Sequence, residues 1–403
     1  MAKKRDKIGI IGGGFGGLKA AKILGEKIGA TVDITLISNK TFFEYYPGLY
    51  RIVTGTSPIE VCIPITEMIP KNISIVLDTI TGIDLPQKKV IGASGDCYQF
   101  DTIIFAMGSE TTYFNLPGLN ELSFGFKSAK EAVRLKEHLF SLFQEHMHPT
   151  PNELVSHYHV VVVGGGPSGV EVAGDLITYL RKLAHMYDVD PSLITVDLIE
   201  SNPRLVPVLP PDVSARVLQQ IRKLGVNVYL NRQLVKEEVE QIYLKDMSMN
   251  AKTLIWTAGT KINELFNEAN GFSLSDRKRV IIDEHLELPK FPDVYVIGDA
   301  AATPYTGLAQ TALYDGAYVA SDIIRKKYDK KRIAYAPQKT AYALPIGNRF
   351  AIFVWGNFKL YGFPAYIIRH VIDFLFFAEF VSVQKLFSLF FEGWKYRKVS
   401  EKL

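Results

Sequence analysis

Cysteine is nearly absent from this 403-residue sequence, which contains only Cys62 and Cys97. The two lie far apart and form neither a CxxC nor a CxxxxC spacing, so neighbouring cysteines cannot build a redox dithiol or a zinc site. A disulfide framework would need more cysteines and an oxidising compartment. We therefore expect two free thiols in a reducing cytoplasm, and no metal site.

Long apolar runs are also missing. No uninterrupted apolar run reaches the roughly 18 residues of a transmembrane helix. The apolar residues after the basic N-terminus are interrupted at Gly12, before the roughly seven residues of a signal-peptide core. The net charge is only +4, which gives no reason to expect nucleic-acid binding. With 47% hydrophobic residues, the chain is long enough for two globular domains and an appendage.

Short runs of apolar, β-branched residues recur along the chain, and each ends in glycine or a turn. The runs are KIGIIG, VDITLIS, DTIIFAMG, HVVVVGGG, ITVDLIE, KTLIWTAG and DVYVIGD. Helical patterns separate several of them, and apolar strands that alternate with helices indicate a parallel sheet covered on both faces. The strand-turn-helix-strand pattern occurs at residues 7–38 and again at 159–200. The fold class predicted is α/β, with two Rossmann-like, doubly wound domains.

The first of these units contains a phosphate-binding loop. Gly12, Gly14 and Gly17 form G-x-G-x-x-G directly after a strand and at the start of a helix. In such loops the first glycine allows the tight turn, the second admits a pyrophosphate, and the third lets helix and strand pack closely. The acid expected at the end of the next strand is missing, and Ser38 or Asn39 would have to bind the ribose instead.

Two later strands complete this first site. FDTIIFAMGS ends in a turn of small residues, and VYVIGDA ends at Asp299. An aspartate at the end of a buried strand is costly unless its charge is hydrogen-bonded. A ribitol hydroxyl of FAD would satisfy it, and the alternative is a helix N-cap for the segment that follows. We favour the ligand role.

The second loop, VVVVGGGPSGVEVAG, has its glycines at Gly164, Gly166 and Gly169, and here the strand-end acid is present as Glu200. Its carboxylate could accept both hydroxyls of an adenosine ribose and would repel a 2′-phosphate. The second site therefore favours NADH over NADPH.

In this order, the motifs GIIGGGFGG, TIIFAMGS, VVVVGGGPSGVEVAG, LIWTAG and VYVIGDAA resemble the flavoproteins with two dinucleotide-binding domains. FFEYYPGLYRIVTGT, PSLITVDLIESNPRLVPVLP, GLAQTA and the aromatic C-terminus further resemble the type II NADH dehydrogenases, single-subunit NADH:quinone oxidoreductases that do not pump protons. The likeness covers essentially the whole chain. Disulfide reductases are excluded, because they need CxxxxC where this chain has NKTFFEYYPG.

The resemblance implies FAD and NADH as cofactors, with an FAD-binding domain over residues 1–118 and 270–337. It places an NADH-binding domain over residues 119–269 and a membrane-association segment over residues 338–403. The residues predicted to bind FAD are Gly12, Gly14, Gly17, Ser38, Asn39, Ala106, Gly108, Asp299, Ala309 and Gln310. Those predicted to bind NADH are Gly164, Gly166, Gly169, Glu200, Ala258 and Gly259.

The predicted catalytic residues are Glu171, Gln310 and Tyr314. The residues alone would favour an exposed, capping glutamate at position 171, but members of the family carry a glutamate there beside the flavin, with a proposed part in hydride or proton handling. The helix with Gln310 is expected to begin near Ala309 and to direct its N-terminus at the flavin. The family usually carries A-Q-x-x-x-Q on this helix, whereas Tyr314 stands at the second glutamine position here.

Tyrosine can donate a hydrogen bond and stack, so a quinone site remains compatible with this departure. Tyr46 and Pro47 are further candidates for the quinone side. Tyr314 nevertheless keeps another enzyme open, a flavoprotein that reduces oxygen or another small acceptor. A third alternative is a binding protein that responds to NADH and resembles the apoptosis-inducing-factor flavoproteins.

After Pro337 the sequence becomes aromatic-rich and strand-poor. From Tyr361 it is strongly apolar but interrupted by charged residues, too many for a span. The best helical pattern follows, with a polar stripe at Lys385, Ser388, Glu392 and Lys395 opposite Val383, Leu386, Phe390 and Trp394. We predict amphipathic helices on the cytoplasmic side of the cell membrane, and removal of the chain after about Tyr361 should then release the protein. The alternative is a helix packed on the protein's own core or in a homodimer interface.

Overall fold

The computed structural model of the chain describes residues 5–55, 61–144 and 156–388. These divide into two compact units. The first unit comprises Met1–Glu44, Cys62–Glu110 and Lys261–Thr340, and the second comprises Tyr45–Val61, Thr111–Thr260 and Ala341–Leu403. The domain boundaries given above remain a prediction.

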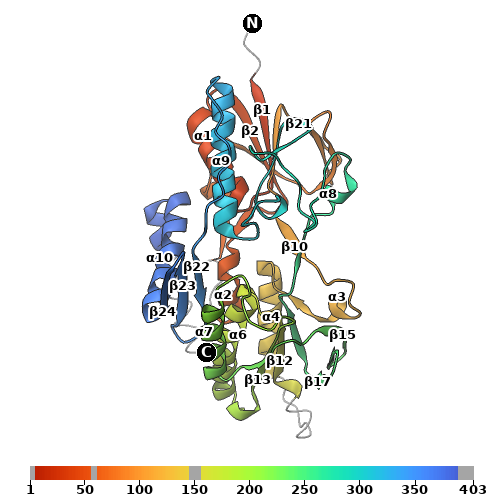
Figure 1. Ribbon diagram of the computed structural model, residues 1–403, viewed down its shortest axis with the longest axis vertical. Coiled ribbons are helices and arrows are strands. Elements are labelled where there is room, and N and C mark those ends of the chain that lie inside the picture. Colours follow the sequence, from red (N-terminus) through yellow and green to blue (C-terminus); the bar gives the residue numbers. More distant parts are fainter. Residues whose placement is uncertain (1–4, 56–60, 145–155, 389–403) are drawn as a thin grey trace. The chain divides into compact units, whose positions relative to one another are not determined.

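The first unit contains most of the N-terminal third of the chain and the segment that ends in helix α9 (Figure 1). Its strands are β1 (Asp6–Ile11), β2 (Val32–Ser38), β3 (Phe42–Glu44), β4 (Cys62–Pro64), β5 (Ser74–Leu77), β6 (Ile80–Asp84), β7 (Lys89–Gly92), β8 (Cys97–Gln99), β9 (Thr102–Phe105), β20 (Glu287–Leu288) and β21 (Phe291–Val296). Its helices and helical turns are α1 (Phe15–Ile28), η3 (Ile65–Glu67), α8 (Leu265–Glu268), η5 (Gly298–Ala300) and α9 (Ala309–Lys327). The chain passes between the units in β10 (Ser109–Thr111) and β19 (Thr260–Ile262).

The main sheet of the first unit has the strand order β20-β21-β9-β1-β2-β5. The pairs from β21 to β5 are all parallel, and only the short β20 is antiparallel. The predicted strands VDITLIS and KIGIIG coincide with β2 and β1 to within one residue. Helices α1 and α9 lie side by side on this unit (Figure 1).

The two helices approach closely at a pair of glycines. A Cβ atom added to Gly316 of α9 would lie 2.3 Å from the carbonyl oxygen of Gly16 in α1. This contact between backbones leaves no room for a side chain. The start of α1 and the first half of α9 are therefore held together.

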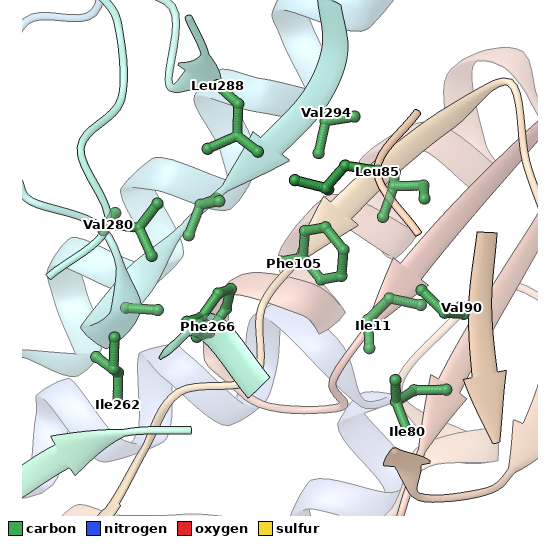
Figure 2. Close-up of a cluster of buried hydrophobic side chains, with 14 of the residues drawn as sticks. Ile11, Ile80, Leu85, Val90, Phe105, Ile262, Phe266, Val280, Leu288 and Val294 are labelled. Atoms are coloured by element: carbon green, nitrogen blue, oxygen red, sulfur yellow. The ribbon is translucent and has the colours of Figure 1, made fainter. Parts of the chain in front are cut away.

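The core of the first unit lies between the sheet and the segment around α8 (Figure 2). Phe105 at the end of β9 packs edge-on against Phe266, with ring centroids 6.0 Å apart, and both side chains are fully buried. Burial of each such ring contributes about 1.5–3 kcal/mol to folding. This packing fixes the carboxyl end of β9, where the predicted turn of small residues begins.

The second unit carries the second glycine loop and the C-terminal segment. Its strands are β11 (Phe124–Gly125), β12 (His159–Val163), β13 (Thr195–Ile199), β14 (Asn227–Tyr229), β15 (Leu234–Glu238), β16 (Gln241–Leu244), β17 (Ser248–Asn250), β18 (Thr253–Trp256), β22 (Tyr342–Pro345), β23 (Ala351–Trp355) and β24 (Phe358–Gly362). Its helices and helical turns are η1 (Tyr46–Gly48), α2 (Leu49–Val53), α3 (Leu119–Leu122), α4 (Ala129–Gln144), α6 (Pro167–Met186), η4 (Pro191–Leu193), α7 (Pro211–Lys223) and α10 (Phe363–Phe380).

The main sheet of the second unit has the order β11-β18-β12-β13-β14, and every pair in it is parallel. Its central strand β12 is buried at all five positions, which explains the uninterrupted apolar run HVVVV. Two doubly wound α/β parts are therefore confirmed. In both, the glycine loop follows a central strand of the sheet.

The expectation that the chain is strand-poor after Pro337 is wrong. Strands β22, β23 and β24 form an antiparallel sheet, and α10 packs against it. The short strands could not be recognised from the aromatic composition, because aromatic residues occur in strands as well as in apolar helices. Within the described part of the chain, no helix is long and apolar enough to cross a membrane.

Candidate functional site

The first glycine loop has a distinct geometry at each of its three glycines. Gly12 has a positive φ of +114°, and a Cβ there would lie 2.3 Å from the carbonyl oxygen of Ala106. A Cβ at Gly17 would lie 2.0 Å from the carbonyl oxygen of Gly12, so helix and strand touch. A Cβ at Gly14, in contrast, would meet nothing within 4 Å. The tight turn is therefore at Gly12, the close packing is at Gly17 and the open space is at Gly14, as the motif predicts.

The open space at Gly14 lies at the N-terminus of α1. Gly14 is the N-cap of this helix, which has no capping side chain and no acid in its first turn. Unoccupied N–H groups at a helix N-terminus attract anions. The loop has the shape and the electrostatics to bind a pyrophosphate.

The residues predicted to replace the missing ribose acid are placed differently from each other. Ser38 is buried at the end of β2, and its Oγ accepts a hydrogen bond from the backbone N–H of Lys40 at 3.2 Å. A Cβ at Gly13 would lie 2.9 Å from that oxygen, so Ser38 contacts the loop directly. Asn39 is exposed. Ser38 is therefore the better placed of the two beside the loop.

Asp299 lies within the helical turn η5, directly after β21. The Oγ of Ser109 donates a hydrogen bond of 2.5 Å to its Oδ2. The N-cap of η5 is Ile297, so Asp299 lies within this turn and is not its N-cap. The side chain instead joins the ends of two parallel strands, because Ser109 follows β9 and the turn at Gly108.

A buried aspartate that the sequence reasoning missed holds this turn in place. Asp315 of α9 is fully buried and accepts hydrogen bonds from the backbone N–H of Gly298 at 3.0 Å and from the Tyr335 hydroxyl at 2.6 Å. Burial raises the pKa of Asp315 to about 6. The sequence does contain an indication that Asp315 is buried. It lies four residues from Thr311 and from Val319, which share the buried face of α9.

Helix α9 begins at Ala309, where the sequence predicted it. Gln310 in its first turn is exposed, and the N-cap residue contributes no side-chain cap. The ring of Tyr314 is half-buried and packs against Tyr335, with centroids 5.6 Å apart. Tyr314 therefore sits on α9 one turn after Gln310, where the family pattern would place a glutamine.

The second glycine loop repeats the geometry of the first. Gly164 has a φ of +112°, and a Cβ there would lie 2.9 Å from the backbone nitrogen of Ala258. A Cβ at Gly169 would lie 1.8 Å from the carbonyl oxygen of Gly164, whereas a Cβ at Gly166 would meet nothing within 4 Å. Gly259, at the end of β18, has a φ of +100°. The second loop can bind a second pyrophosphate at the N-terminus of α6.

Glu200 lies directly after β13 and contacts the loop. Its Oε2 accepts a hydrogen bond of 2.6 Å from the backbone N–H of Gly165. Its Oε1 accepts hydrogen bonds from the backbone and the side-chain amide of Asn202, both at 2.6 Å, and from the Ser201 hydroxyl at 3.2 Å. A carboxylate oxygen can accept about two hydrogen bonds. Oε2 therefore keeps capacity for a ribose hydroxyl.

Glu171 is the fifth residue of α6 and is half-buried. It does not cap the helix, whose N-cap is Gly166. Burial raises the pKa of Glu171 to about 8. The negative charge of Asp175 also raises this pKa. The positive charges of Arg369 and, to a smaller extent, Arg51 lower it. The exposed, capping glutamate considered from the sequence is thus not what the structure has.

A buried charged cluster interacts electrostatically with Glu171, and it was not predicted. Asp373 of α10 is 1% exposed and accepts a hydrogen bond of 2.5 Å from the Tyr45 hydroxyl. Its two oxygens also pair with the guanidinium groups of Arg51 and Arg369. Burial opposes ionisation of Asp373, yet Arg51 and Arg369 hold its pKa below the usual range.

The same cluster reaches the segment suggested for the quinone side. Arg369 donates a hydrogen bond of 2.8 Å from Nη2 to the carbonyl oxygen of Pro47. The neighbouring Tyr46 is exposed, with 38% of its surface accessible. The structure thus joins the start of η1 to α10. Of the other predicted residues, Ser38 and Ala106 lie against the first glycine loop, and Glu200 and Ala258 lie against the second.

Comparison with known proteins places this arrangement in a family. Residues 6–316 match the pyridine nucleotide-disulphide oxidoreductase family. The chain is 31% identical over 344 residues to the type II NADH:quinone oxidoreductase Ndh of Mycobacterium tuberculosis, covering 79% of this chain and 72% of the relative. It is 24% identical to the type II NADH:quinone oxidoreductase of Staphylococcus saprophyticus, covering 93% and 95%.

Among solved structures, the NDH2 of Plasmodium falciparum in complex with NADH has the same fold, with a TM-score of 0.87 at 19% identity. The similarity covers 97% of this chain and 98% of that one. The fold therefore extends beyond the region of the family match and includes the C-terminal segment. Together with the matches over most of its length, this shows that the chain belongs to the pyridine nucleotide-disulphide oxidoreductases and, within them, to the type II NADH:quinone oxidoreductases.

Proposed function

We propose that the protein is an FAD-dependent enzyme that oxidises NADH and reduces a membrane quinone by two electrons without pumping protons. One observation carries the proposal. Two phosphate-binding loops with the same turn, open space and close packing occur in one chain, and the second is followed by Glu171 in a buried charged environment. One loop would serve FAD and the other NADH.

FAD fits the first unit. The open space outside Gly14 admits a pyrophosphate at the N-terminus of α1, and Ser38 lies against the loop for the ribose. Asp299 accepts a hydrogen bond from Ser109, and Asp315 holds the adjacent turn at Gly298. We infer that Asp299 binds a ribitol hydroxyl of FAD. The chemistry that FAD supplies when bound is acceptance of a hydride from NADH and onward transfer of two electrons.

NADH fits the second unit. Gly166 offers the same open space at the start of α6, and Glu200 would bind the adenosine ribose through Oε2. Its negative charge would repel a 2′-phosphate, so NADH is preferred to NADPH. Glu171, one turn into α6, is the residue to hold or deliver a proton near neutral pH, because the rise in its pKa puts its charge change there.

The membrane proposal rests on α10. Its outward face is a stripe of exposed apolar side chains at helical spacing: Phe363, Ile367, Val371, Phe374 and Leu375. A surface of this kind suits a helix that lies in the membrane interface. We infer a peripheral protein on the cytoplasmic side of the cell membrane, where α10 meets the quinone pool. Trp394, which the sequence places on the apolar side of the next helical pattern, lies outside the described residues.

The stripe differs from the one expected at 383–395. Leu386 is fully buried while Val383 is 62% exposed, so these two residues do not share an apolar face. Phe390, Glu392, Trp394 and Lys395 lie outside the described residues. The described apolar surface is therefore on the preceding helix.

Stopped-flow spectroscopy of the FAD-loaded protein tests the function. Reduction by NADH is followed by mixing with a water-soluble quinone or with oxygen. Fast reoxidation by the quinone supports the proposal. Fast reoxidation by oxygen alone would identify an oxidase, the alternative that Tyr314 keeps open, and slow reoxidation by both would indicate a binding protein that responds to NADH.

Two matched glycine variants test the two cofactor assignments. Gly14→Ala and Gly166→Ala each add a methyl group where the protein has open space. Crowding of a bound phosphate by one methyl costs about 1–3 kcal/mol, or roughly 5- to 150-fold in affinity. Gly14→Ala is expected to weaken FAD binding, measured by FAD content, while Gly166→Ala raises KM for NADH at normal FAD content. The reverse assignment would exchange these results. Both glycines are helix N-caps, where alanine is less favourable, so the melting temperature of the FAD-free protein should fall slightly and to a similar extent in the two variants.

Glu200→Ala is expected to raise KM for NADH more than it lowers kcat, because it removes a contact made equally before and during hydride transfer. Its partners on Oε1 leave Oε2 as the contact with ribose. Steady-state kinetics with NADH and NADPH check this prediction, and the preference for NADH should decrease. An unchanged KM would remove Glu200 from the site. Asp190→Asn, at an exposed carboxylate in the same unit, is the control.

A further inference from the structure

Helix α10 has its charged residues inside and its apolar residues outside. Arg369 and Asp373, one turn apart, are 4% and 1% exposed. Ile367 and Leu375 on the opposite side are 45% and 61% exposed. Burial of two ionised side chains costs several kcal/mol unless they are paired and hydrogen-bonded. The burial of Arg369 and Asp373 must therefore be explained by the partners that they bind inside the protein.

The buried pair ties α10 to the segment Tyr45–Arg51. Asp373 accepts a hydrogen bond from Tyr45 and pairs with Arg51, while Arg369 donates to the carbonyl oxygen of Pro47. The Tyr45 ring also packs against Phe377, with centroids 4.8 Å apart. The backbone at Pro47 is thus fixed by a residue of the helix that carries the exposed apolar stripe.

The charges of the cluster are not balanced within it. Arg51 and Arg369 carry two positive charges, and Asp373 carries one negative charge. The remaining positive charge acts on Glu171, and Arg369 is the strongest cationic influence on that residue. Among the described residues, Nε of Arg369 has no hydrogen-bond partner although it is buried. Helix α10 therefore brings a counter-charge to the region of Glu171.

We propose that Arg369 and Asp373 are positioning residues, through which the seating of α10 sets the charge around Glu171 and the backbone position at Pro47. The inference rests on the proposed function, because it describes how the quinone half of that reaction is coupled to the membrane-facing helix. A displaced α10 would withdraw both the hydrogen bond to Pro47 and the counter-charge. Quinone reduction would then depend on contact between α10 and the rest of its unit.

The proposal predicts opposite effects of the two residues. The groups that act on Glu171 are Arg51 of α2, Asp175 of its own helix, and Arg369 and Asp373 of α10; Tyr50 of α2 also interacts with it. Arg369 lowers the pKa of Glu171, and Asp373 raises it. Loss of Arg369 therefore moves the titration to higher pH, and loss of Asp373 moves it to lower pH.

The experiment compares Arg369→Gln, Asp373→Asn and the wild type, each FAD-loaded and bound to lipid vesicles that contain a quinone. The rate of flavin reoxidation is measured between pH 5 and pH 10 after reduction by NADH. Arg369→Gln is expected to move the midpoint of the profile upward and Asp373→Asn downward, each on the order of one pH unit. Glu379→Gln removes an exposed charge from the same helix and should leave the midpoint unchanged.

Two further variants separate charge from structure. Arg369→Lys keeps the positive charge and loses the guanidinium geometry, so it should slow reoxidation without moving the midpoint. In Arg369→Gln/Glu171→Gln the profile should match that of Glu171→Gln alone. A merely structural role would lower activity in every variant and would produce no opposite shifts.

Midpoints that stay in place, or move in the same direction, would overturn the inference. Asp373→Asn keeps the shape of its side chain, so its result decides the matter if Arg369→Gln fails to bind FAD. The proposed function fails in a different way: the wild type itself would then be reoxidised slowly by every quinone tested. Reduction by NADH, which needs neither Arg369 nor Asp373, should remain within about threefold of wild type in Arg369→Gln, Arg369→Lys and Asp373→Asn.

Discussion

Glu171→Gln is expected to slow reoxidation of the reduced enzyme by a quinone about a hundredfold at pH 7, with reduction by NADH little changed. A carboxyl whose pKa lies near the working pH can deliver a proton to the acceptor, and such general acid catalysis contributes roughly 10²–10⁴ in rate. Glutamine has nearly the same shape and no proton to give. Stopped-flow measurement of the two half-reactions separates the effects.

The rate of reoxidation by a quinone should also change with pH in a defined direction. Burial raises the pKa of Glu171 to about 8, so the protonated form predominates below that value. Quinone-dependent reoxidation of the wild type should therefore fall as the pH rises through about 8, whereas the profile of Glu171→Gln should be flat. Glu137→Gln, at an exposed glutamate of α4 in the same unit, is the matched control and should behave as wild type. Equal slowing of both half-reactions would show that Glu171 has no specific part in quinone reduction.

Stability distinguishes a catalytic effect from damage to the fold. A carboxyl with a raised pKa binds more protons in the folded state than in the unfolded one, so its contribution to stability decreases as pH rises from about 4.5 to about 8. Glutamine removes this dependence. In the FAD-free protein, Glu171→Gln should therefore be at least as stable as wild type at pH 8.5, which thermal unfolding can check.

The second large effect is expected from the outward face of α10. The double variant Val371→Glu/Leu375→Glu should move most of the protein from vesicles into the supernatant after centrifugation. The two side chains are 48% and 61% exposed, so they can change without disturbing the core. Withdrawing a valine or leucine from an apolar phase costs about 1.5–3 kcal/mol each, which for two sites is a hundredfold or more in partitioning.

The control for this variant uses the same residue types elsewhere. Leu77→Glu/Val239→Glu also replaces an exposed leucine and an exposed valine, but neither lies on α10. It should remain with the vesicles. If the α10 variant stays bound and instead changes the molecular mass in solution, the stripe is a homodimer interface and the membrane proposal fails.

The structure also changes which experiment is informative. The sequence alone favours truncation after about Tyr361 as the test of membrane binding. However, α10 packs on the sheet of β22–β24 through Ala365 and supplies Arg369 and Asp373 to the buried cluster. Its removal would leave Arg51 buried without its carboxylate, which costs about 3–5 kcal/mol. Surface substitutions are therefore the cleaner test of membrane binding.

The features that the sequence predicted well are local ones. The two glycine loops could be placed to the residue, because a strand, a turn and a helix follow one another closely in the sequence. Each glycine stands where a side chain would block the turn, the pyrophosphate or the packing of helix on strand. The start of α9 at Ala309 was predicted for the same reason. Parallel strands were recognisable because burial on both faces leaves an uninterrupted apolar run.

The features that it missed depend on contacts between distant residues. Arg369 and Asp373 are among the charged residues that interrupt the apolar segment after Tyr361, and a hydropathy pattern assumes that such residues face water. Their partners Tyr45 and Arg51 are 322 to 328 residues away along the chain. Asp315 was missed for a similar reason, since its partner Tyr335 lies in a segment without regular structure.

The separation of these partners has a consequence for synthesis. Tyr45 and Arg51 precede Asp373 of α10 by 328 and 322 residues, so they leave the ribosome well before it. Until α10 has emerged, Arg51 lacks the carboxylate of Asp373, and the apolar stripe of α10 has not formed. If α10 attaches the protein to the membrane as we propose, attachment cannot precede its synthesis, and a chain interrupted before α10 would be unable to pass electrons to the lipid phase.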